Sequence, residues 1–393
     1  MASVAMGLLA PQGAMAGGFD TGERDWDALF GAGETVGVET GVRYISPERD
    51  ISNVVTAALT AGATTTSEAE AFTVFRASAN ARFGDHLRCL ASYREPFEGH
   101  ANYGSGWIGA AAVIEQHFET RDYGLTCAGT MTLETGQVSV IAGASYQEAE
   151  FELQQVAVII PGVGPPPFGA PFTVVGRSQT SVDDSSWGWR LGVAYEIPEY
   201  ALRASLIYNS QVDYDMSGTV AITAGPTVIP VTGTLSMPGS LELKVQSGVA
   251  LGWLAFGSIR WTDWSVADAM VLRDAGGTQR SGLELQWQDS WTLTAGAVHQ
   301  FNDLLAVTGS LTWDQGATNG FTPQTDTWVG AVNAVFNPTE HAQVVLGGSL
   351  GLMTSGTYST ATLNSGLSNP LAYSASFGND LVYGLNASLR LSF

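Results

Sequence analysis

The chain ends on the sequence LVYGLNASLRLSF, Leu381 to Phe393, in which every second residue is apolar. The residues between these apolar positions are mostly small or polar, and they include Arg390. Alternation with a period of two predicts a β-strand with one face in an apolar medium and the other in a polar medium. The same alternation recurs from Trp187 to Glu196 and from Trp291 to Ala297. Most of the chain is therefore expected to form two-faced strands.

The composition limits the classes of partner. The chain has 393 residues, 47 glycines, 13% charged residues, a formal net charge of −21 and a single lysine, Lys244. Soluble domains usually carry about 25% charged residues. The acidic charge argues against a nucleic-acid partner, which needs a basic surface. We interpret the acidic residues as solvated positions in turns and loops; an acidic site for a cationic ligand is the alternative.

Short and long connections alternate between the expected strands. The short turns lie near Gly136, Pro198, Asn302 and Pro338. The long connections are residues 98–119, 153–185, 218–237, 267–279, 316–325 and 354–379. Alternating segments of about ten residues, with short turns at one end and long loops at the other, are typical of an outer-membrane barrel. The pattern predicts an all-β protein, a transmembrane antiparallel β-barrel of about 14 strands with both termini on the short-turn side.

A soluble β-sandwich would also show alternation, but its strands are usually about five to six residues long. Aromatic residues at the ends of the segments fit a membrane interface instead. The tryptophans assigned to this role are Trp253, Trp261, Trp264, Trp287, Trp291, Trp313 and Trp328. The uncharged run from Leu153 to Gly176 contains five prolines, which exclude a continuous membrane helix.

The first residues, MASVAMGLLAPQGAMAGGFD, are similar to an export signal. Residues 1–16 contain an apolar stretch and a small-x-small end at Ala14-Met15-Ala16, without the usual positive start. Either the true translation start lies upstream or the segment is not a signal. We favour the first alternative and expect the mature chain to begin near Gly17.

Three stretches go beyond a generic barrel: Val36 to Val54, Trp187 to Gly218, and Met237 to Ser265 with its WTDWS ending. Together they resemble the outer-membrane long-chain fatty-acid and hydrocarbon transporter family (FadL/TodX type), from about Trp26 to Phe393. The resemblance implies a monomeric barrel with an N-terminal hatch, passive uptake of hydrophobic molecules and capture at two apolar outer loops. It also implies release sideways through a kink in the third strand.

The resemblance divides the chain into a short hatch, residues 17–35, and a barrel, residues 36–393. WDALF, Trp26 to Phe30, stands where the family has an Asn-Pro-Ala motif, and the hatch is shorter than usual, which puts its gating role in doubt. The apolar outer loops are assigned to residues 156–175 and 219–237. The residues expected to contact ligand are Phe19, Trp26, Leu29, Phe30, Arg94, Phe97, Val158, Ile159, Ile160, Phe168, Phe172, Val228 and Ile229.

Two residues of the third strand leave alternatives open. Pro96 cannot donate a ladder hydrogen bond, so it either kinks the wall and forms the lateral exit or ends the strand. Arg94 is the preferred inward-facing arginine for a ligand carboxylate. The alternative for it and for Arg88, Arg190, Arg203, Arg260 and Arg390 is pairing with inward acids such as Glu196, Asp213 and Asp215.

Enzymatic chemistry is not expected. GGSLG, Gly347 to Gly351, fits the G-x-S-x-G pattern, but Ser349 lies in an alternating segment rather than at a strand-to-helix elbow. The five histidines show no metal spacing along the sequence, and no cofactor is predicted.

Cys89 and Cys127 fall on the lipid-facing side of their strands and roughly opposite each other in a hairpin. They are either bridged or two small apolar residues, and the second alternative is slightly preferred.

The sequence therefore predicts a monomeric bacterial outer-membrane barrel that takes up long-chain fatty acids or other hydrophobic molecules. Its expected partners are the lipid bilayer, lipopolysaccharide and, through the terminal Phe393, the barrel-assembly machinery. A general-diffusion or structural barrel is the alternative function. An outer-membrane lipid hydrolase is a third hypothesis that rests on Ser349 alone.

Overall fold

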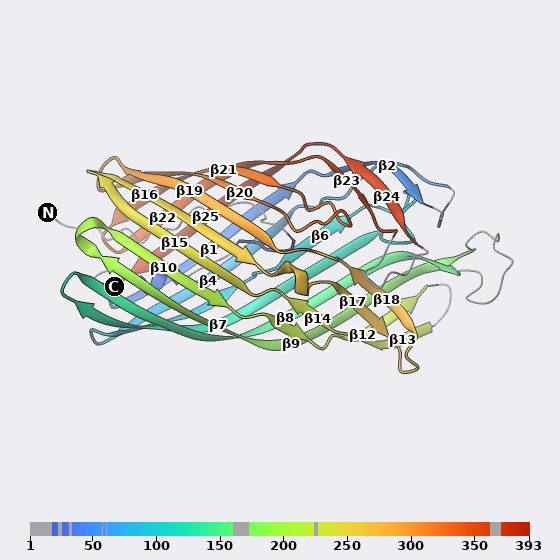
Figure 1. Cartoon of the computed structure of the whole chain (residues 1–393), viewed down its shortest axis with the longest axis horizontal. Coiled ribbons are helices and arrows are strands. Elements are labelled where there is room, and N and C mark those ends of the chain that lie inside the picture. Colours follow the sequence, from blue (N-terminus) through green and yellow to red (C-terminus); the bar gives the residue numbers. More distant parts are fainter. Residues whose placement is uncertain are drawn as a thin grey trace.

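The computed structural model describes residues 18–22, 26–30, 34–56, 58–59, 61–159, 173–223, 227–361 and 371–393. Long tilted strands run side by side around a single elongated barrel (Figure 1). Among these described residues, no helix has the length and apolarity needed to cross a membrane. The predicted export signal, residues 1–16, lies outside them.

In the part of the chain that the structure describes, the barrel wall has fourteen strand positions, and each strand is antiparallel to its neighbours. The strands are β1 (Val36–Pro47), β4 (Phe72–Phe83), β5 (Leu87–Arg94) continued by β6 (Glu98–Asn102), β7 (Glu115–Leu133), β8 (Gly136–Ile159), β9 (Thr173–Ile197), β10 (Leu202–Asn209), β15 (Ser240–Ala250), β16 (Trp253–Thr262), β19 (Ser290–Gln300), β20 (Leu305–Asp314), β21 (Thr327–Thr339), β22 (Ala342–Met353) and β25 (Asp380–Ser392). Pairing of β1 with both β4 and β25 closes the ring. The predicted fold class is confirmed.

Shorter elements extend the wall at the long-loop end, away from Phe393 (Figure 1). They are β2 (Asp50–Thr56), β3 (Thr66–Ser67), β11 (Val212–Tyr214), β12 (Ser217–Ile222), β13 (Thr227–Thr232), β14 (Leu235–Met237), β17 (Ala269–Arg273), β18 (Gln279–Glu284), β23 (Gly356–Ser359) and β24 (Tyr373–Phe377). The 3-10 helices are η1 (Trp26–Phe30), η2 (Pro198–Tyr200) and η3 (Trp264–Val266).

These extensions correct the two predicted apolar loops. The first predicted loop, residues 156–175, is shorter, because β8 continues to Ile159 and β9 begins at Thr173. The second, residues 219–237, contains the β12–β13 hairpin, in which β12 pairs with the outer part of β9. The physical reason is that both runs are rich in β-branched residues, which favour strands, and a long β9 offers them a free edge.

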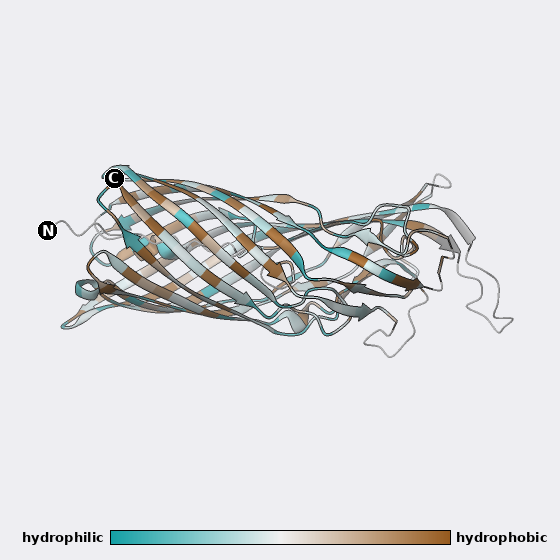
Figure 2. Cartoon of the chain, turned by 90° about the horizontal axis from the view of Figure 1, so that it is seen from above, coloured by the Kyte–Doolittle hydropathy of each residue, from teal (hydrophilic) through white to brown (hydrophobic). Residues whose placement is uncertain are grey.

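The alternation of the last strand matches its exposure. Tyr383, Leu385 and Leu389 are exposed, whereas Val382 and Ser388 are buried. Figure 2 shows the same alternation of hydrophobic and hydrophilic bands along neighbouring wall strands. The odd-numbered face of this strand therefore points to lipid, as predicted.

Most of the assigned tryptophans lie on the outer surface, but two do not. Trp253, Trp291 and Trp328 are exposed, in keeping with an interfacial role. Trp264 and Trp287 were wrongly assigned, because they are 1% and 5% exposed and pack inside the barrel. They belong to η3 and to the segment after β18, where the chain leaves the wall and the alternation no longer fixes which side a residue faces.

The structure joins Cys89 of β5 to Cys127 of β7 by a disulfide. The preferred expectation of two free thiols is therefore wrong. The two residues lie directly opposite each other in the ladder, where side chains on the same face are close enough to bond.

A disulfide predicts no free thiol in the unreduced protein. Denatured, unreduced protein should take up no maleimide label, and reduction should release two reactive thiols per chain. The double variant Cys89→Ala/Cys127→Ala should lose about 2–4 kcal/mol of stability in a urea titration, because its unfolded chain is less constrained. Two labelled thiols without reductant would contradict the bridge.

Candidate functional site

The barrel wall contains an opening between β4 and the third wall strand. Their ladder stops at the pair Arg76↔Arg94, and the next backbone pairing is the bridge Ala69↔Ala101. Between these two points, the described residues 71–75 and 95–99 form no backbone–backbone hydrogen bond with each other. An unpaired stretch of this kind is unusual in a wall that faces lipid, where backbone groups need partners.

Pro96 lies at a β-bulge in this third strand. The ladder with β7 pairs Arg94 with Asp122 and then Glu98 with Glu119, so residues 95–97 lie opposite only residues 120 and 121. β6 continues the strand beyond Pro96 against the same neighbour. Proline has no backbone N–H, and a bulge leaves one residue without a ladder partner, so a proline at a bulge costs the ladder no hydrogen bond. The bulge also bends the strand.

Side chains complete the backbone hydrogen bonding on both sides of residues 95–97, toward β7 and toward β4. The Phe97 backbone N–H donates to Thr120 Oγ1 at 3.0 Å. On the other side, the Phe75 backbone N–H donates to Glu95 Oε2 at 2.7 Å. Phe72 of β4 stacks on His100 of β6 across the opening, with ring centroids 5.4 Å apart. The opening is thus lined by specific contacts rather than by disordered backbone.

The backbone of residues 19–21 closes the opening from inside the barrel. The Thr21 N–H donates to the Pro96 carbonyl at 3.0 Å, and the Glu98 N–H donates to the Phe19 carbonyl at 2.8 Å. Asp20 and Phe97 form an antiparallel bridge. These hatch residues therefore take the place next to the third strand that β4 leaves vacant.

An aromatic cluster covers the inner side of the same place. The ring of Phe19 lies 4.9 Å from that of Phe118 and 4.8 Å from that of Trp287. Trp264 packs on Trp287 at 4.9 Å and on Phe97 at 5.8 Å. These rings belong to a continuous apolar core that fills the outer half of the barrel.

Gly99 is required for this packing. A Cβ atom at Gly99 would lie 2.2 Å from the ring of Phe19. Because that distance is far below van der Waals contact, only glycine allows the hatch to approach the third strand this closely.

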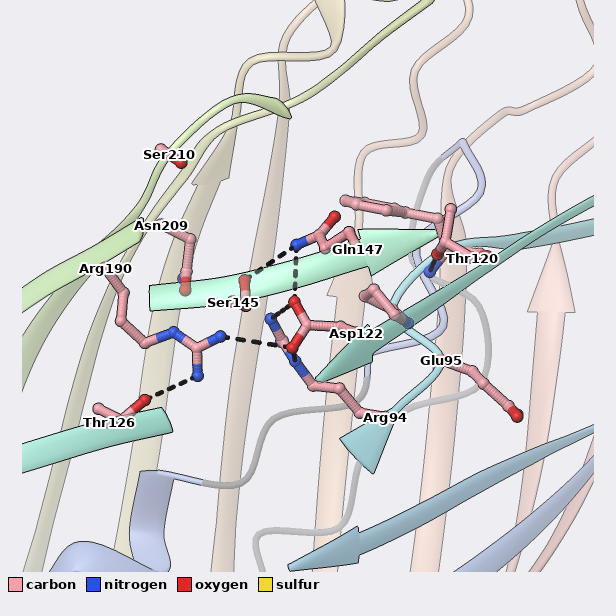
Figure 3. Close-up of polar contacts among 12 residues, drawn as sticks. Arg94, Glu95, Thr120, Asp122, Thr126, Ser145, Gln147, Arg190, Asn209 and Ser210 are labelled. Carbon is pink, nitrogen blue, oxygen red and sulfur yellow. Dashed lines mark hydrogen bonds and ion pairs between the residues drawn. The ribbon is translucent and has the colours of Figure 1, made fainter. Parts of the chain in front are cut away.

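Below the aromatic cluster, a polar network joins four neighbouring strands of the wall, β5, β7, β8 and β9 (Figure 3). Asp122 accepts from Arg94 Nη2 at 3.0 Å and from Gln147 Nε2 at 2.6 Å, and it lies 3.6 Å from Arg190 Nη2. The indole of Trp26 lies against both guanidinium groups, 5.0 Å from that of Arg94 and 4.6 Å from that of Arg190. Cation–π contacts of this kind strengthen when they are desolvated. The network therefore fixes η1 to the wall.

Ion pairs attach the hatch at three further points. The pairs are Asp20 with Arg260 at 3.2 Å, Asp27 with Arg203 at 2.8 Å and Lys244 at 3.1 Å, and Glu34 with Arg88 at 3.2 Å and with Arg390. The expected partners Asp213 and Asp215 are instead exposed, since the chain leaves the wall after Asn209. The inward arginines thus bind hatch acids and Asp122.

The hatch separates two cavities. The outer one, about 140 Å³, is lined by Phe19, Gly99 and Met353 together with Arg49 and Glu68. Burial raises the pKa of the Glu68 carboxyl, while Arg49 opposes this shift. The inner one, about 870 Å³, extends from Leu29 and Phe30 to the short turns and is lined about equally by polar and apolar groups.

Residues 24–390 match the family described as outer membrane protein transport protein (OMPP1/FadL/TodX). The chain belongs to this family. The family and the closed barrel place it in the bacterial outer membrane.

Two curated relatives align with parts of this family member. Outer membrane protein P1 of Haemophilus influenzae is 28% identical over 176 residues, 42% of this chain and 38% of the relative. The long-chain fatty acid transport protein of Salmonella typhi is 24% identical over 257 residues, 58% of this chain and 56% of the relative. The chain therefore spans less than two thirds of either relative.

Solved structures of the family share the fold. A Pseudomonas aeruginosa FadL homologue superposes with a TM-score of 0.79 at 15% identity, covering 97% of each chain. The Pseudomonas putida toluene transporter TodX gives a TM-score of 0.62 at 12% identity, covering 97% of this chain and 96% of that one.

The structure distributes the predicted ligand residues over different places. Phe19 and Phe97 meet at the opening, and Trp26 lies in the polar network. Leu29 and Phe30 line the inner cavity.

The predicted outer residues lie further away. On β13, Val228 is exposed, and the half-buried Ile229 packs against the apolar core. Val158 and Ile159 lie on β8, but their side chains fall outside the described residues, as do Ile160, Phe168 and Phe172.

Sequence reasoning missed three aromatic residues of the site: Phe118, Trp264 and Trp287. Phe118 has the inward parity of its strand, because its neighbours His117 and Glu119 are more exposed. That parity was available in the sequence. The inward direction of the two tryptophans could not be predicted from the sequence, because both lie outside the wall strands.

Ser349 lies within β22, paired with Ala331 on one side and Gly384 on the other. A nucleophile elbow needs a sharp strand-to-helix turn. The G-x-S-x-G match therefore lacks the backbone geometry of a hydrolase.

The ion pairs of Asp27 give a test of hatch attachment. Asp27→Asn removes the charge that faces Arg203 and Lys244, so it should weaken docking of η1 by about 3 kcal/mol. Single-channel conductance in planar bilayers should rise in the variant. Asp303→Asn, in an exposed turn, is the control and should keep the wild-type conductance. Equal conductance in all three proteins would show that Asp27 does not hold the hatch.

Proposed function

We propose that the protein takes up hydrophobic molecules, foremost long-chain fatty acids, by passive passage through the outer membrane. One observation carries this proposal: among the described residues, the ladder between β4 and the third strand is interrupted beside Pro96, at the foot of an apolar interior, and hatch backbone pairs with the third strand there. An apolar route that ends at a side opening suits a cargo whose destination is lipid.

In this proposal, the cargo enters at the outer end, where the apolar run of residues 156–175 and the β12–β13 hairpin provide the first contacts. It then moves through the apolar core to the outer cavity beside Phe19. Displacement of Phe19 and Thr21 from the third strand opens the lateral exit at Pro96. The loss of only a few hydrogen bonds makes this step reversible.

Transfer of the cargo into lipid supplies the driving force. Each buried CH₂ group contributes about 0.8 kcal/mol, so an acyl chain needs no other source of energy.

The choice of fatty acids rests on the family resemblance and on the name of the Salmonella relative. Arg94 was the preferred partner for a carboxylate, but its guanidinium already binds Asp122 through two nitrogens, at 3.2 and 3.0 Å. A fatty-acid carboxylate at Arg94 would have to displace Asp122. We therefore assign Arg94 first to positioning Trp26 and only second to ligand binding.

General diffusion of small polar solutes is the second candidate function. The charged groups in the lining of the inner cavity, among them Arg82, Arg88 and Glu196, favour it. The hatch opposes it, since η1 and its ion pairs lie across the barrel between the two cavities. Rapid passage of sugars and ions through refolded wild-type protein in liposomes would favour this alternative over hydrophobic uptake.

Assembly is expected to follow the usual route for outer-membrane barrels, with lipopolysaccharide around a monomeric wall. The proposed signal for the barrel-assembly machinery is Phe393, whose side chain is exposed at the end of β25. Its backbone pairs with Val36, so the strand that carries the signal also closes the barrel.

Deletion of Pro96 tests the exit. Residues 95–97 face two residues of β7, so removal of one residue restores a continuous register with β7 and should remove the bend in the third strand on which the exit depends. Uptake of a fluorescent long-chain fatty acid should fall at least tenfold in cells that carry this variant. The control Pro96→Ala keeps the residue count and the bulge, and it should retain most uptake. Undiminished uptake by the correctly folded deletion variant would overturn the lateral route.

A further inference from the structure

A cluster of metal-ligating side chains lies on the rim of the opening. We name Glu70, Glu98, His100 and His117 the rim cluster. His100 of β6 and His117 of β7 are directly opposite in the ladder, and their ring centroids are 4.3 Å apart. One ligand atom each from Glu70, His100 and His117 fits within 4.8 Å of the others. The sequence hid this site because His100 and His117 come together only through the register of two strands.

Several donor atoms of the rim cluster have no hydrogen-bond partner among the described residues. Glu70 Oε2, Glu98 Oε2 and His117 Nε2 are buried atoms that lack a hydrogen-bond partner among the described residues. Glu98 has a side chain only 8% exposed, and its Oε1 lies 2.9 Å from His100 Nε2. Buried polar atoms without partners are costly, so three of them in one place indicate a missing ligand.

The charge at this place favours a cation. His117 Nε2 lies 3.5 Å from Glu70 Oε2 and 3.6 Å from Glu115 Oε1. The nearby Arg121 is engaged by Glu119 and Glu150. Two imidazoles with a carboxylate are a common donor set for zinc and related transition-metal ions. The contact with Glu98 would orient the His100 ring, as outer partners of metal-bound histidines commonly do.

The rim cluster spans the two sides of the opening. Glu70 lies two residues before the start of β4, whereas His100 and His117 belong to β6 and β7 on the other side. In a tetrahedral zinc site with bonds of about 2.0 Å, the ligand atoms lie about 3.3 Å apart. Because the three donors are up to 4.8 Å apart, a bound ion would draw Glu70 toward the histidines.

We propose that the rim cluster binds one divalent transition-metal ion of the zinc class, and that the bound ion holds the lateral opening closed. Binding and closure stand on the geometry of the rim, whereas the effect on uptake rests on the function proposed above. Zinc would then act as an inhibitor of uptake.

Binding is tested on the refolded full-length barrel with zinc and with cobalt. Isothermal titration with Zn²⁺ should give one saturable site, and Co²⁺ should give the visible absorption of a tetrahedral complex. His117→Gln and Glu70→Gln should weaken Zn²⁺ binding by about 10- to 100-fold, whereas the control His86→Gln, in an exposed turn, should not change it. No saturable site, or equal affinity in all four proteins, would overturn the proposal.

Closure is tested without transport. Spin labels at Thr73 of β4 and Glu119 of β7 should show a shorter and narrower distance distribution when Zn²⁺ is added. The shift should be absent in the His117→Gln background. An unchanged distribution in a protein that binds zinc would overturn the clamp.

The functional consequence is tested last, by fatty-acid uptake with Zn²⁺ or with a chelator. Zinc should slow uptake at least fivefold in wild type and not in His117→Gln. Uptake that zinc leaves unchanged would overturn the inhibitory role. Absence of uptake under both conditions would count against the proposed function alone, because the titration and the spin labels report on the rim independently.

Discussion

The structure depends on one constraint: backbone polar groups that face lipid must find partners within the protein. A closed ladder meets this need along nearly the whole wall. At Pro96 the ladder is broken, and other groups complete the hydrogen bonding. Glu95 and Thr120 serve the edges of the break, and the backbone of Phe19 and Thr21 serves its centre. The position of the hatch is thus a direct consequence of the defect in the wall.

The same constraint explains the division of the interior. The outer half contains apolar and aromatic side chains, whereas the middle contains arginines and acids that bind the hatch. A charged group inside the barrel is tolerated only with a counter-charge, and Asp20, Asp27 and Glu34 provide one at three heights. The acids of the hatch therefore neutralise cationic side chains of the wall, and the hatch also obstructs the passage.

Much of the fold could be predicted from the sequence, because a period of two fixes both the strand and its lipid-facing side. The outward face of Leu385 and the opposition of Cys89 and Cys127 both follow from it. Alternation says little where the chain leaves the wall, which is why Trp264 and Trp287 were assigned to the wrong surface. Alternation also cannot show which residues of different segments come into contact in the folded barrel. The pairing of Arg203 with Asp27 depends on the hatch entering the closed barrel, and the meeting of His100 with His117 depends on the register of β6 and β7.

The disulfide gives the opening an asymmetric mechanical character. Cys89 and Cys127 link β5 covalently to β7, and both β5 and β6 keep their ladder with β7 on either side of the bulge. No disulfide joins β4 to the third strand; the turn of residues 84–86 connects them at the far end, and their ladder ends at Arg76. The β7 side of the opening is consequently stiff, whereas the β4 side is compliant. Any widening is a displacement of β4 together with its partner β1, so the elastic resistance to passage resides in that pair of strands.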